Sequence, residues 1–306
     1  SVMNAYMALN GVPAAANAWL LNGVLRGAWG FDGMVISDAD TVKSLVTQGL
    51  ARDWGDAAAR AINAGLDAEL NFGPSAMSEL PAALAAGSVS METLDAAVRR
   101  VLLAKLRLGL FDSPFVDESR AGTVTADPGH REVAREAAER SAVLLRNEGN
   151  LLPLHNPTRI AVLGYLAASR RDTVGNWVFV ADIEETVTVV DGLREKLGES
   201  ARVTYEPGVL LPPRKFPSLF AKLDGPEPDY ENFDQSVELD KAVAAASAAE
   251  VVVLVLGEGQ NMSGESSSRS TLALPGEQEH LLKAVVATGV PVVLLLMSAR
   301  PLDIRW

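Results

Sequence analysis

The feature that most constrains the fold is a pair of uninterrupted apolar runs near the end of the chain. Residues 251–256 read VVVLVL and residues 290–296 read VPVVLLL, with a helical pattern at 276–288 between them. Each run has the length of a strand. Strands that are apolar throughout suit a parallel sheet with both faces covered. The chain is therefore predicted to adopt an α/β fold.

Strands and helices also alternate in the first third of the chain. Repeats at this spacing predict parallel β/α architecture. The segment supplies about three such units, whereas a closed barrel takes roughly eight, so a barrel would need further strands upstream of residue 1. Ser90 and Thr93 are alternative N-caps for the last helix. The expected strands are 2–8, 34–36 and 66–70, and the expected helices are 13–27, 41–49, 54–64 and 90–109.

A polar segment rich in helix breakers divides the chain. Residues 113–128 show no periodicity, so they are predicted to be a linker between a first domain, 1–112, and a second, 129–306. In the second domain, residues 207–235 are predicted to be a long surface insertion. The remaining expected elements there are helices at 130–147, 191–197 and 239–249 and strands at 159–164 and 203–206.

Composition excludes several classes of function. The net charge is −12 and Lys and Arg form no block, which makes nucleic acid and anionic membranes poor partners. No apolar run reaches the ~20 residues of a membrane span. The chain has no cysteine and only three widely spaced histidines, so neither thiol chemistry nor a metal site is predicted. No cofactor is expected.

Two carboxylates directly follow the strand expected at 34–36. Parallel strands present reactive groups at their carboxyl ends, and Asp38 and Asp40 occupy such an end. The competing interpretation is that one of them caps the helix that begins near Thr41. We assign Asp40 to the cap and Asp38 to the pocket.

A long aperiodic segment follows the strand at 251–256 and contains Glu258, Glu265 and Arg269. Loops of this length are uncommon in compact α/β domains unless they have a function, although a solvated surface loop is the alternative. GEGQNMSG also resembles a glycine-rich nucleotide turn. It lacks a third glycine at the expected offset, and no helix follows until after Pro275, so that interpretation is weak.

Two carboxylates from separate segments indicate glycoside hydrolysis. In a retaining mechanism one carboxylate attacks the sugar and the other protonates the leaving oxygen, and the two groups lie about 5–5.5 Å apart. Asp38 and Glu265 both follow strand ends. A cleft between two domains would allow them to meet.

Four segments resemble glycoside hydrolase family 3, the β-glucosidase and β-xylosidase group, and they occur in the family's order. The resemblance covers nearly the whole chain. It implies the C-terminal portion of a (β/α)8-like barrel followed by an α/β sandwich domain that is incomplete at its C-terminus. The segments are the nucleophile region with GFDGMVISD, the start of the second domain with RSAVLLRNEGNLLPL, the acid/base loop MSGESSSRSTLALPGEQ, and the next strand, VVLLLMSARPLDI.

The resemblance also implies roles for individual residues. Asp38 corresponds to the nucleophile and Glu265 to the acid/base, with Glu258 as the alternative because this loop varies within the family. Tyr6 and Met3 correspond to positions that line the subsite for the terminal sugar. Tyr6 is expected to donate a hydrogen bond to ionised Asp38, and Glu265 must be protonated to act as the acid.

The chain departs from the family pattern in two ways. Position 39 is often aromatic in the family but is Ala39 here, which removes a stacking wall beside the sugar and leaves the substrate open. The family's upstream sugar-binding residues would fall before residue 1. We therefore expect the chain to be an internal piece of a larger enzyme.

The sequence thus predicts a retaining, exo-acting β-glycosidase, with β-glucosidase as the first choice. The alternatives are a β-xylosidase or α-arabinofuranosidase, a non-catalytic carbohydrate-binding relative, and a nucleotide-binding protein. The expected partners are small β-glycosides or oligosaccharides, and a homodimer is compatible with the sequence. The expected location is periplasmic or secreted.

Overall fold

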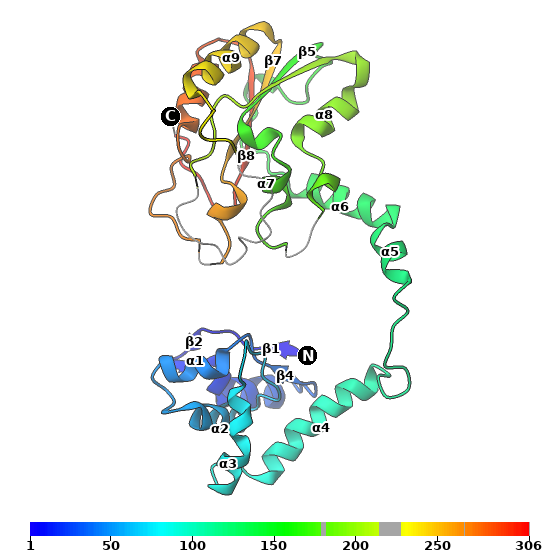
Figure 1. Cartoon of the computed structure of the whole chain (residues 1–306), viewed down its shortest axis with the longest axis vertical. Coiled ribbons are helices and arrows are strands. Elements are labelled where there is room, and N and C mark those ends of the chain that lie inside the picture. Colours follow the sequence, from blue (N-terminus) through cyan, green and yellow to red (C-terminus); the bar gives the residue numbers. More distant parts are fainter. Residues whose placement is uncertain (179–181, 214–227, 266, 306) are drawn as a thin grey trace. The chain divides into compact units, whose positions relative to one another are not determined.

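The computed structural model describes residues 1–178, 182–213, 228–265 and 267–305. The chain forms two compact units, Ser1–Ser141 and Ala142–Trp306 (Figure 1). Both are α/β units with parallel strands, and each has its own hydrophobic core.

The first unit is built on β1 (Val2–Met3) and β4 (Val35–Ile36), which pair in parallel. The strand predicted at 2–8 is wrong beyond Met3, because the chain turns at Asn10 and Gly11, both at positive φ, and forms an antiparallel hairpin. The strand predicted at 66–70 is reduced to one parallel bridge, between Ala68 and Ile36. The hairpin consists of β2 (Ala8–Leu9) and β3 (Val12–Pro13).

The helix predicted at 13–27 is also interrupted. Residues Ala14–Ala16 form a 3-10 turn and Trp19–Ala28 form a π-helix. Asn17 causes the break, because its backbone leaves the helical region and its side-chain oxygen accepts a hydrogen bond from the Leu20 amide at 3.0 Å. An asparagine side chain in this position starts a new helix rather than continuing the old one.

The later helices of the first unit agree with the sequence. They are α1 (Thr41–Thr47), α2 (Trp54–Ala64) and α4 (Met91–Arg107). Ser90 caps α4 by accepting from the Thr93 amide at 3.1 Å, which settles the choice between the two predicted caps. A 3-10 turn (Ala76–Glu79), α3 (Leu80–Ala85) and α5 (Arg120–Thr125) complete the unit with α6 (Pro128–Ser141).

The helix predicted at 130–147 ends too late by six residues, since α6 ends at Ser141. Asn147 belongs to a turn instead. Its side chain pairs with both backbone groups of Leu152, accepting from the amide at 3.0 Å and donating to the carbonyl at 2.8 Å. The segment 113–128, predicted to lack regular structure, contains α5.

The second unit contains a four-stranded parallel sheet in the order β6–β5–β7–β8. Every residue of the central strand β7 is buried, which confirms that its apolar run is covered on both faces. Uninterrupted burial of this kind is expected where helices lie on each side of a parallel sheet. The strands are β5 (Arg159–Leu163), β6 (Arg202–Glu206), β7 (Val251–Gly257) and β8 (Val292–Met297).

Helices cover both faces of this sheet (Figure 1). One core joins the sheet to side chains of α9 and α10, and another joins it to α8. Val209 and Leu211 are buried, one in each core, so the start of the predicted surface insertion 207–235 lies inside the unit, and residues 214–227 of it fall outside the described part. The helices are α7 (Arg170–Val174), α8 (Val189–Leu197), α9 (Gln235–Ala248) and α10 (Gln278–Val286).

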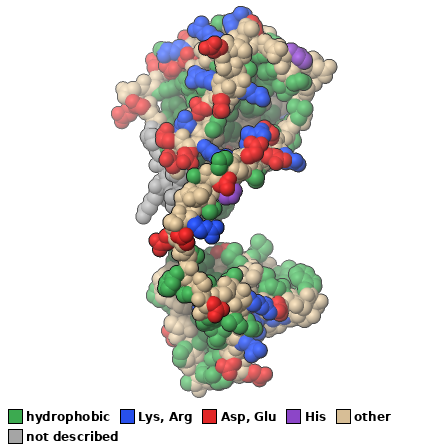
Figure 2. All heavy atoms as spheres, turned by 90° about the vertical axis from the view of Figure 1, so that its right-hand side faces the viewer, with side chains coloured by type: hydrophobic (Ala, Val, Ile, Leu, Met, Phe, Trp, Pro, Cys, Tyr) green, Lys and Arg blue, Asp and Glu red, His purple; other side chains and the backbone are tan. Residues whose placement is uncertain are grey.

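The surfaces of the two units differ in character. On the face shown in Figure 2, hydrophobic side chains gather on the first unit, whereas acidic and basic side chains are interspersed on the second. Val98, Leu102 and Leu106 are exposed at four-residue intervals along α4. This spacing places them on one side of the helix.

Candidate active site

The end of β4 is fixed by Ser37, which is completely buried. The Ser37 amide donates to the carbonyl of Ala68 at 2.9 Å, and the Ser37 hydroxyl accepts from the amide of Leu70 at 2.8 Å. The same hydroxyl donates to the carbonyl of Asp38 at 2.8 Å. The strand end is therefore bound on one side to the neighbouring segment 68–70.

Asp38 is half-buried in the turn between β4 and α1. Its Oδ1 accepts a hydrogen bond from the amide of Ala39 at 2.7 Å, and its carbonyl accepts from the amide of Thr41 at 3.1 Å. These bonds orient the carboxylate against its own turn. The side chain lies at the carboxyl end of a parallel strand, as the sequence predicts.

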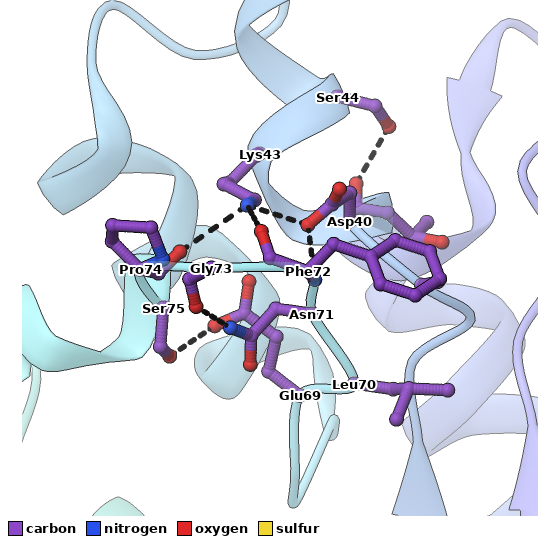
Figure 3. A network of polar contacts seen from close by, with 12 residues as sticks. Asp40, Lys43, Ser44, Glu69, Leu70, Asn71, Phe72, Gly73, Pro74 and Ser75 are labelled. Atoms are coloured by element: carbon purple, nitrogen blue, oxygen red, sulfur yellow. Dashed lines mark hydrogen bonds and ion pairs between the residues drawn. The ribbon is translucent and has the colours of Figure 1, made fainter.

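Asp40 does not cap α1 with its side chain, and the predicted cap is wrong in this respect. Its backbone adopts a left-handed conformation with φ of 57°, which aspartate tolerates better than most residues. Figure 3 shows the carboxylate directed towards Lys43 and Phe72 instead. Oδ1 lies 2.5 Å from Nζ of Lys43 and accepts from the amide of Phe72 at 3.0 Å. The hydrogen bond from Lys43 holds the pKa of Asp40 below its usual value.

A loop at 69–75, which the sequence analysis did not single out, forms part of this region (Figure 3). Lys43 donates to the carbonyls of Phe72 and Pro74 at 3.0 and 3.2 Å. Glu69 accepts from the hydroxyl of Ser75 and from the amide of Met77. The Gly73–Pro74 turn signal after a predicted strand was available in the sequence and could have located this loop.

Tyr6 and Met3 are far from β4 in the sequence but contact it and the turn after it. Met3 pairs with Ile36 in the parallel ladder, and its side chain is exposed. The hydroxyl of Tyr6 donates to the carbonyl of Ala39. The predicted acceptor was the carboxylate of Asp38, so this bond reaches the residue after it.

The second group of candidates begins where β7 ends. Gly257 allows β7 to approach β8, because a Cβ atom at this position would lie 1.9 Å from the carbonyl oxygen of Met297. The next residue, Glu258, donates its amide to that same oxygen at 2.8 Å. Its side chain is only 1% exposed, so the carboxylate begins the loop from inside the protein.

Both oxygens of Glu258 contact donors. Oε1 accepts from Nη1 of Arg269 at 2.8 Å. Oε2 accepts from the hydroxyl of Ser298 at 2.9 Å and lies 3.1 Å from Nε of Arg300. A buried carboxylate needs such partners, because an unpaired charge away from water is costly.

Glu265 is exposed in the same loop. It follows Gly264, whose φ is 98° and where a Cβ would lie 2.1 Å from Nδ2 of Asn176. The backbone before Glu265 is thus closely packed while its side chain is accessible. The predicted residues fall into two groups, Asp38, Asp40, Tyr6 and Met3 in the first unit and Glu258 and Glu265 in the second.

Two kinds of structural feature are absent from the part of the chain that the structure describes. No group of three or more His, Asp or Glu side chains there is arranged to hold a metal ion. No helix within those residues has the length and apolar character needed to cross a membrane.

Known proteins resemble the chain along nearly its whole length. A periplasmic β-glucosidase of Salmonella typhimurium is 39% identical over 311 residues, covering 99% of this chain and 40% of the relative. A β-xylosidase of Formosa agariphila is 33% identical over 322 residues, covering 100% and 41%. The structure of a β-glucosidase from Listeria innocua in complex with glucose is 34% identical, with a TM-score of 0.83 over 99% of this chain and 38% of that one. The chain therefore spans about two fifths of the length of these relatives.

Two family models match the chain in sequence order. The N-terminal domain of glycosyl hydrolase family 3 matches residues 1–104, and the C-terminal domain of the same family matches residues 142–306. The second match covers more than half of the chain by itself. The chain belongs to glycosyl hydrolase family 3.

Proposed function

We propose that the protein is a retaining, exo-acting β-glycosidase that removes terminal non-reducing sugars, with β-glucosides as its main substrates. The relative from Salmonella typhimurium is a β-glucosidase, and the solved relative from Listeria innocua binds glucose. In this proposal the first unit is the end of a β/α barrel and the second is an α/β sandwich domain. Because the Salmonella relative is periplasmic, we also infer a periplasmic or secreted location.

The observation that carries the proposal is the setting of Asp38 at the carboxyl end of β4. Its carboxylate is oriented by the Ala39 amide, and the turn is fixed through buried Ser37. A nucleophilic carboxylate must be held in this way, because small displacements of a reacting group reduce the rate steeply.

In the proposed reaction, Asp38 attacks the anomeric carbon of the terminal sugar. The bond from that carbon to the aglycone oxygen breaks while the bond to the aspartate oxygen forms, and Glu265 gives its proton to the departing oxygen. Glu265 then takes a proton from water, which attacks the same carbon and releases Asp38. The mechanism needs the two carboxyl groups about 5–5.5 Å apart.

Glu265 suits the acid/base role better than Glu258. Glu265 is exposed on its loop, so it can exchange protons with substrate and water. Glu258 is buried and both of its oxygens contact donors. In this proposal Tyr6 and Met3 line the subsite for the terminal sugar, and Ala39 leaves the aglycone side open.

The second candidate function is β-xylosidase, alone or combined with α-arabinofuranosidase activity. The observation in its favour is the β-xylosidase of Formosa agariphila, which aligns with the whole chain. Nitrophenyl β-glucoside, β-xyloside and α-arabinofuranoside, assayed side by side, will rank the three activities. A protein that binds these sugars without hydrolysing them would instead be a carbohydrate-binding relative.

The decisive experiment replaces Asp38 by Asn in the full-length protein. We expect kcat on the best nitrophenyl glycoside to fall at least about 10³-fold, because the covalent intermediate can no longer form. Asp40→Asn is the matched control and should keep most of the activity. A fluorinated aryl glycoside that traps the intermediate should label the peptide containing Asp38. If Asp38→Asn retains a tenth of wild-type kcat, the nucleophile is another residue.

The acid/base is tested by Glu265→Ala with added azide. Azide should restore the release of good leaving groups, because it attacks the glycosyl-enzyme in place of the water that no longer has a base and forms a glycosyl azide. The same measurement on Glu258→Ala should show no rescue. If azide rescues Glu258→Ala instead, the acid/base is Glu258.

A further inference from the structure

The two arginines that contact Glu258 also contact the loop that carries Glu265. Nη2 of Arg300 donates to the carbonyl of Met262 at 2.9 Å and lies 3.2 Å from the carbonyl of Ser267. These two carbonyls precede and follow Glu265. The guanidinium group of Arg300 therefore binds the loop on both sides of the proposed acid/base.

Arg269 fixes the far part of the same loop. Its Nη1 binds Glu258, and its Nη2 donates to the carbonyl of Ala273 at 2.8 Å. The side chains of Arg269 and Arg300 are only 16% and 21% exposed. Two cations held this close to each other and this far from water require an anion between them, and Glu258 supplies it.

The contacts of Arg269 and Arg300 do not require Glu258 to donate a proton. They require the negative charge and the planar shape of its carboxylate. A carboxylate presents two oxygens to two guanidinium groups at once, a geometry that an amide cannot reproduce with both donors. Loss of the charge would leave Arg269 and Arg300 to repel each other. Their hydrogen bonds to the carbonyls of Met262, Ser267 and Ala273 would weaken as a result.

We propose that Glu258 is a positioning residue that holds Arg269 and Arg300 so that they keep the loop around Glu265 in its working conformation. This inference rests on the proposed function, in which Glu265 is the acid/base. Glu258 acts through the loop, and it touches neither sugar nor water in the reaction.

The proposal predicts a dependence on leaving group that a purely structural residue would not produce. Protonation by Glu265 matters for an alkyl glycoside, whose leaving oxygen is basic, and matters little for a dinitrophenyl glycoside. In the full-length protein, Glu258→Gln should lower kcat/KM about 10- to 100-fold on the alkyl glycoside. On the dinitrophenyl glycoside the loss should be less than about threefold. Equal losses on both substrates would overturn the proposal.

A double mutant separates action through Glu265 from independent effects. Once Glu265 is replaced by Ala, adding Glu258→Gln should leave the ratio of the two kcat/KM values unchanged within about twofold, because the group being positioned is gone. A further loss of that ratio in the double mutant would overturn the proposal.

The proposed function and the positioning role fail in different ways. If Glu265→Ala itself leaves the alkyl glycoside unaffected, the acid/base assignment is wrong and the positioning role falls with it. If Glu265→Ala lowers that activity but Glu258→Gln does not, the acid/base assignment stands and only the positioning role is wrong.

Two further variants guard against a folding defect. Glu250 precedes β7 and pairs with Arg159 at 3.1 Å, so Glu250→Gln is the loss of an exposed, ion-paired carboxylate at the other end of the strand and should leave kcat/KM unchanged. Arg300→Lys keeps a cation near Glu258 but loses the planar group that reaches two carbonyls. It should reproduce the leaving-group effect even if Glu258→Gln does not fold. Wild-type kinetics in a folded Arg300→Lys protein would overturn the proposal.

Discussion

The two candidate carboxylates follow strand ends that the protein holds in different ways. Asp38 comes two residues after β4, and its turn is bound to the segment 68–72 by the backbone amides of Ser37 and Asp40 and by the side chain of Asp40. Glu265 comes eight residues after β7, and its loop is bound through the buried carboxylate of Glu258. A residue next to a strand inherits the rigidity of the sheet, whereas a residue on a long loop needs a separate anchor.

The first unit contains a second buried carboxylate that lies between two arginines, as Glu258 does. Asp67 lies between Arg26 and Arg100, 2.7 Å from each, and its side chain is fully buried. It also accepts from the amide of Val35 at 2.8 Å, at the start of β4 rather than beyond its end. The two clusters share a charge pattern, and both bind loop carbonyls. Arg26 donates to the carbonyls of Gly33 and Gly65 at 2.8 and 3.1 Å, whereas the cluster of Glu258 binds the loop that carries Glu265.

The largest expected loss of stability is that of a substitution at Gly257, the last residue of β7. Gly257→Ala would place a Cβ against the backbone carbonyl of Met297, which has little freedom to move because it belongs to β8, and the residue has a φ of 141°. We expect a loss of about 3 kcal/mol or more in the free energy of unfolding, from backbone strain and steric overlap together. Chemical denaturation of the full-length protein measures it.

The control for this change is Gly289→Ala. Gly289 also has positive φ, but no atom lies within 4 Å of the added methyl group, so only the backbone cost of about 1 kcal/mol applies. Similar losses at both positions would show that the close approach of β7 to β8 does not limit stability.

The next largest loss of stability is expected for a substitution at Ser37, just after β4. Ser37→Ala removes a buried hydroxyl that accepts from the amide of Leu70 and donates to the carbonyl of Asp38. Each lost hydrogen bond costs about 1 kcal/mol, so we expect a loss of about 2 kcal/mol. Ser247→Ala is the control, since its hydroxyl only donates to a carbonyl within α9 and is exposed. Thermal unfolding should show a clear decrease for Ser37→Ala and almost none for Ser247→Ala. Equal midpoints would mean that the turn of Asp38 does not depend on this bond.

Much of the framework behind this comparison could be predicted from local patterns. Helix α2 was predicted residue for residue, because its alanine-rich face is periodic and Asp53 and Gly65 bound it. The apolar run of β7 likewise required burial on both sides. The position of Asp38 followed from the rule that parallel strands present groups at their carboxyl ends.

The sequence could not predict the contacts between distant segments. Arg269 lies four residues after Glu265, a spacing that suggests a local pair, yet its described carboxylate partner is Glu258. Arg300 reaches Glu258 only because β7 and β8 are neighbours in the sheet. The shortened strand at Leu66–Leu70 has the same origin, because pairing across the sheet determines which apolar run becomes a strand.

A smaller loss of stability is expected for a substitution at Gly264, just before Glu265. In Gly264→Ala the added methyl group meets the end of the flexible Asn176 side chain, at a φ of 98°. Since that side chain can move aside, we expect a cost of about 1 kcal/mol, mostly from the left-handed backbone. Adding Asn176→Ala should therefore recover little of the loss in chemical denaturation. Complete recovery would place the cost in the contact with the Asn176 side chain, so that Gly264, like Gly257, would be required mainly by a close contact.

The smallest effect concerns the charge of Asp40, two residues after the proposed nucleophile Asp38. Its pKa in the folded protein is below the ordinary value of 3.8, chiefly because Lys43 donates a hydrogen bond to it. A carboxyl group with a lowered pKa stabilises the fold above its unfolded pKa, and this contribution disappears as the pH falls through the folded value. Asp40→Asn, which keeps a side chain suited to a left-handed backbone, should thus lower the melting temperature slightly above about pH 5 and not at all well below pH 3.8.

Lys43→Gln provides the matching measurement from the other side of the ion pair. It should reproduce the pH dependence of Asp40→Asn, and the two changes together should cost less than their sum, because both remove the same interaction. A melting temperature difference that stays constant from pH 7 to below the ordinary carboxyl pKa would show that the ion pair is not its source. The end of β4 would then be held by hydrogen bonds without an ion pair, in contrast to the loop after β7, which is held through the charged cluster of Glu258.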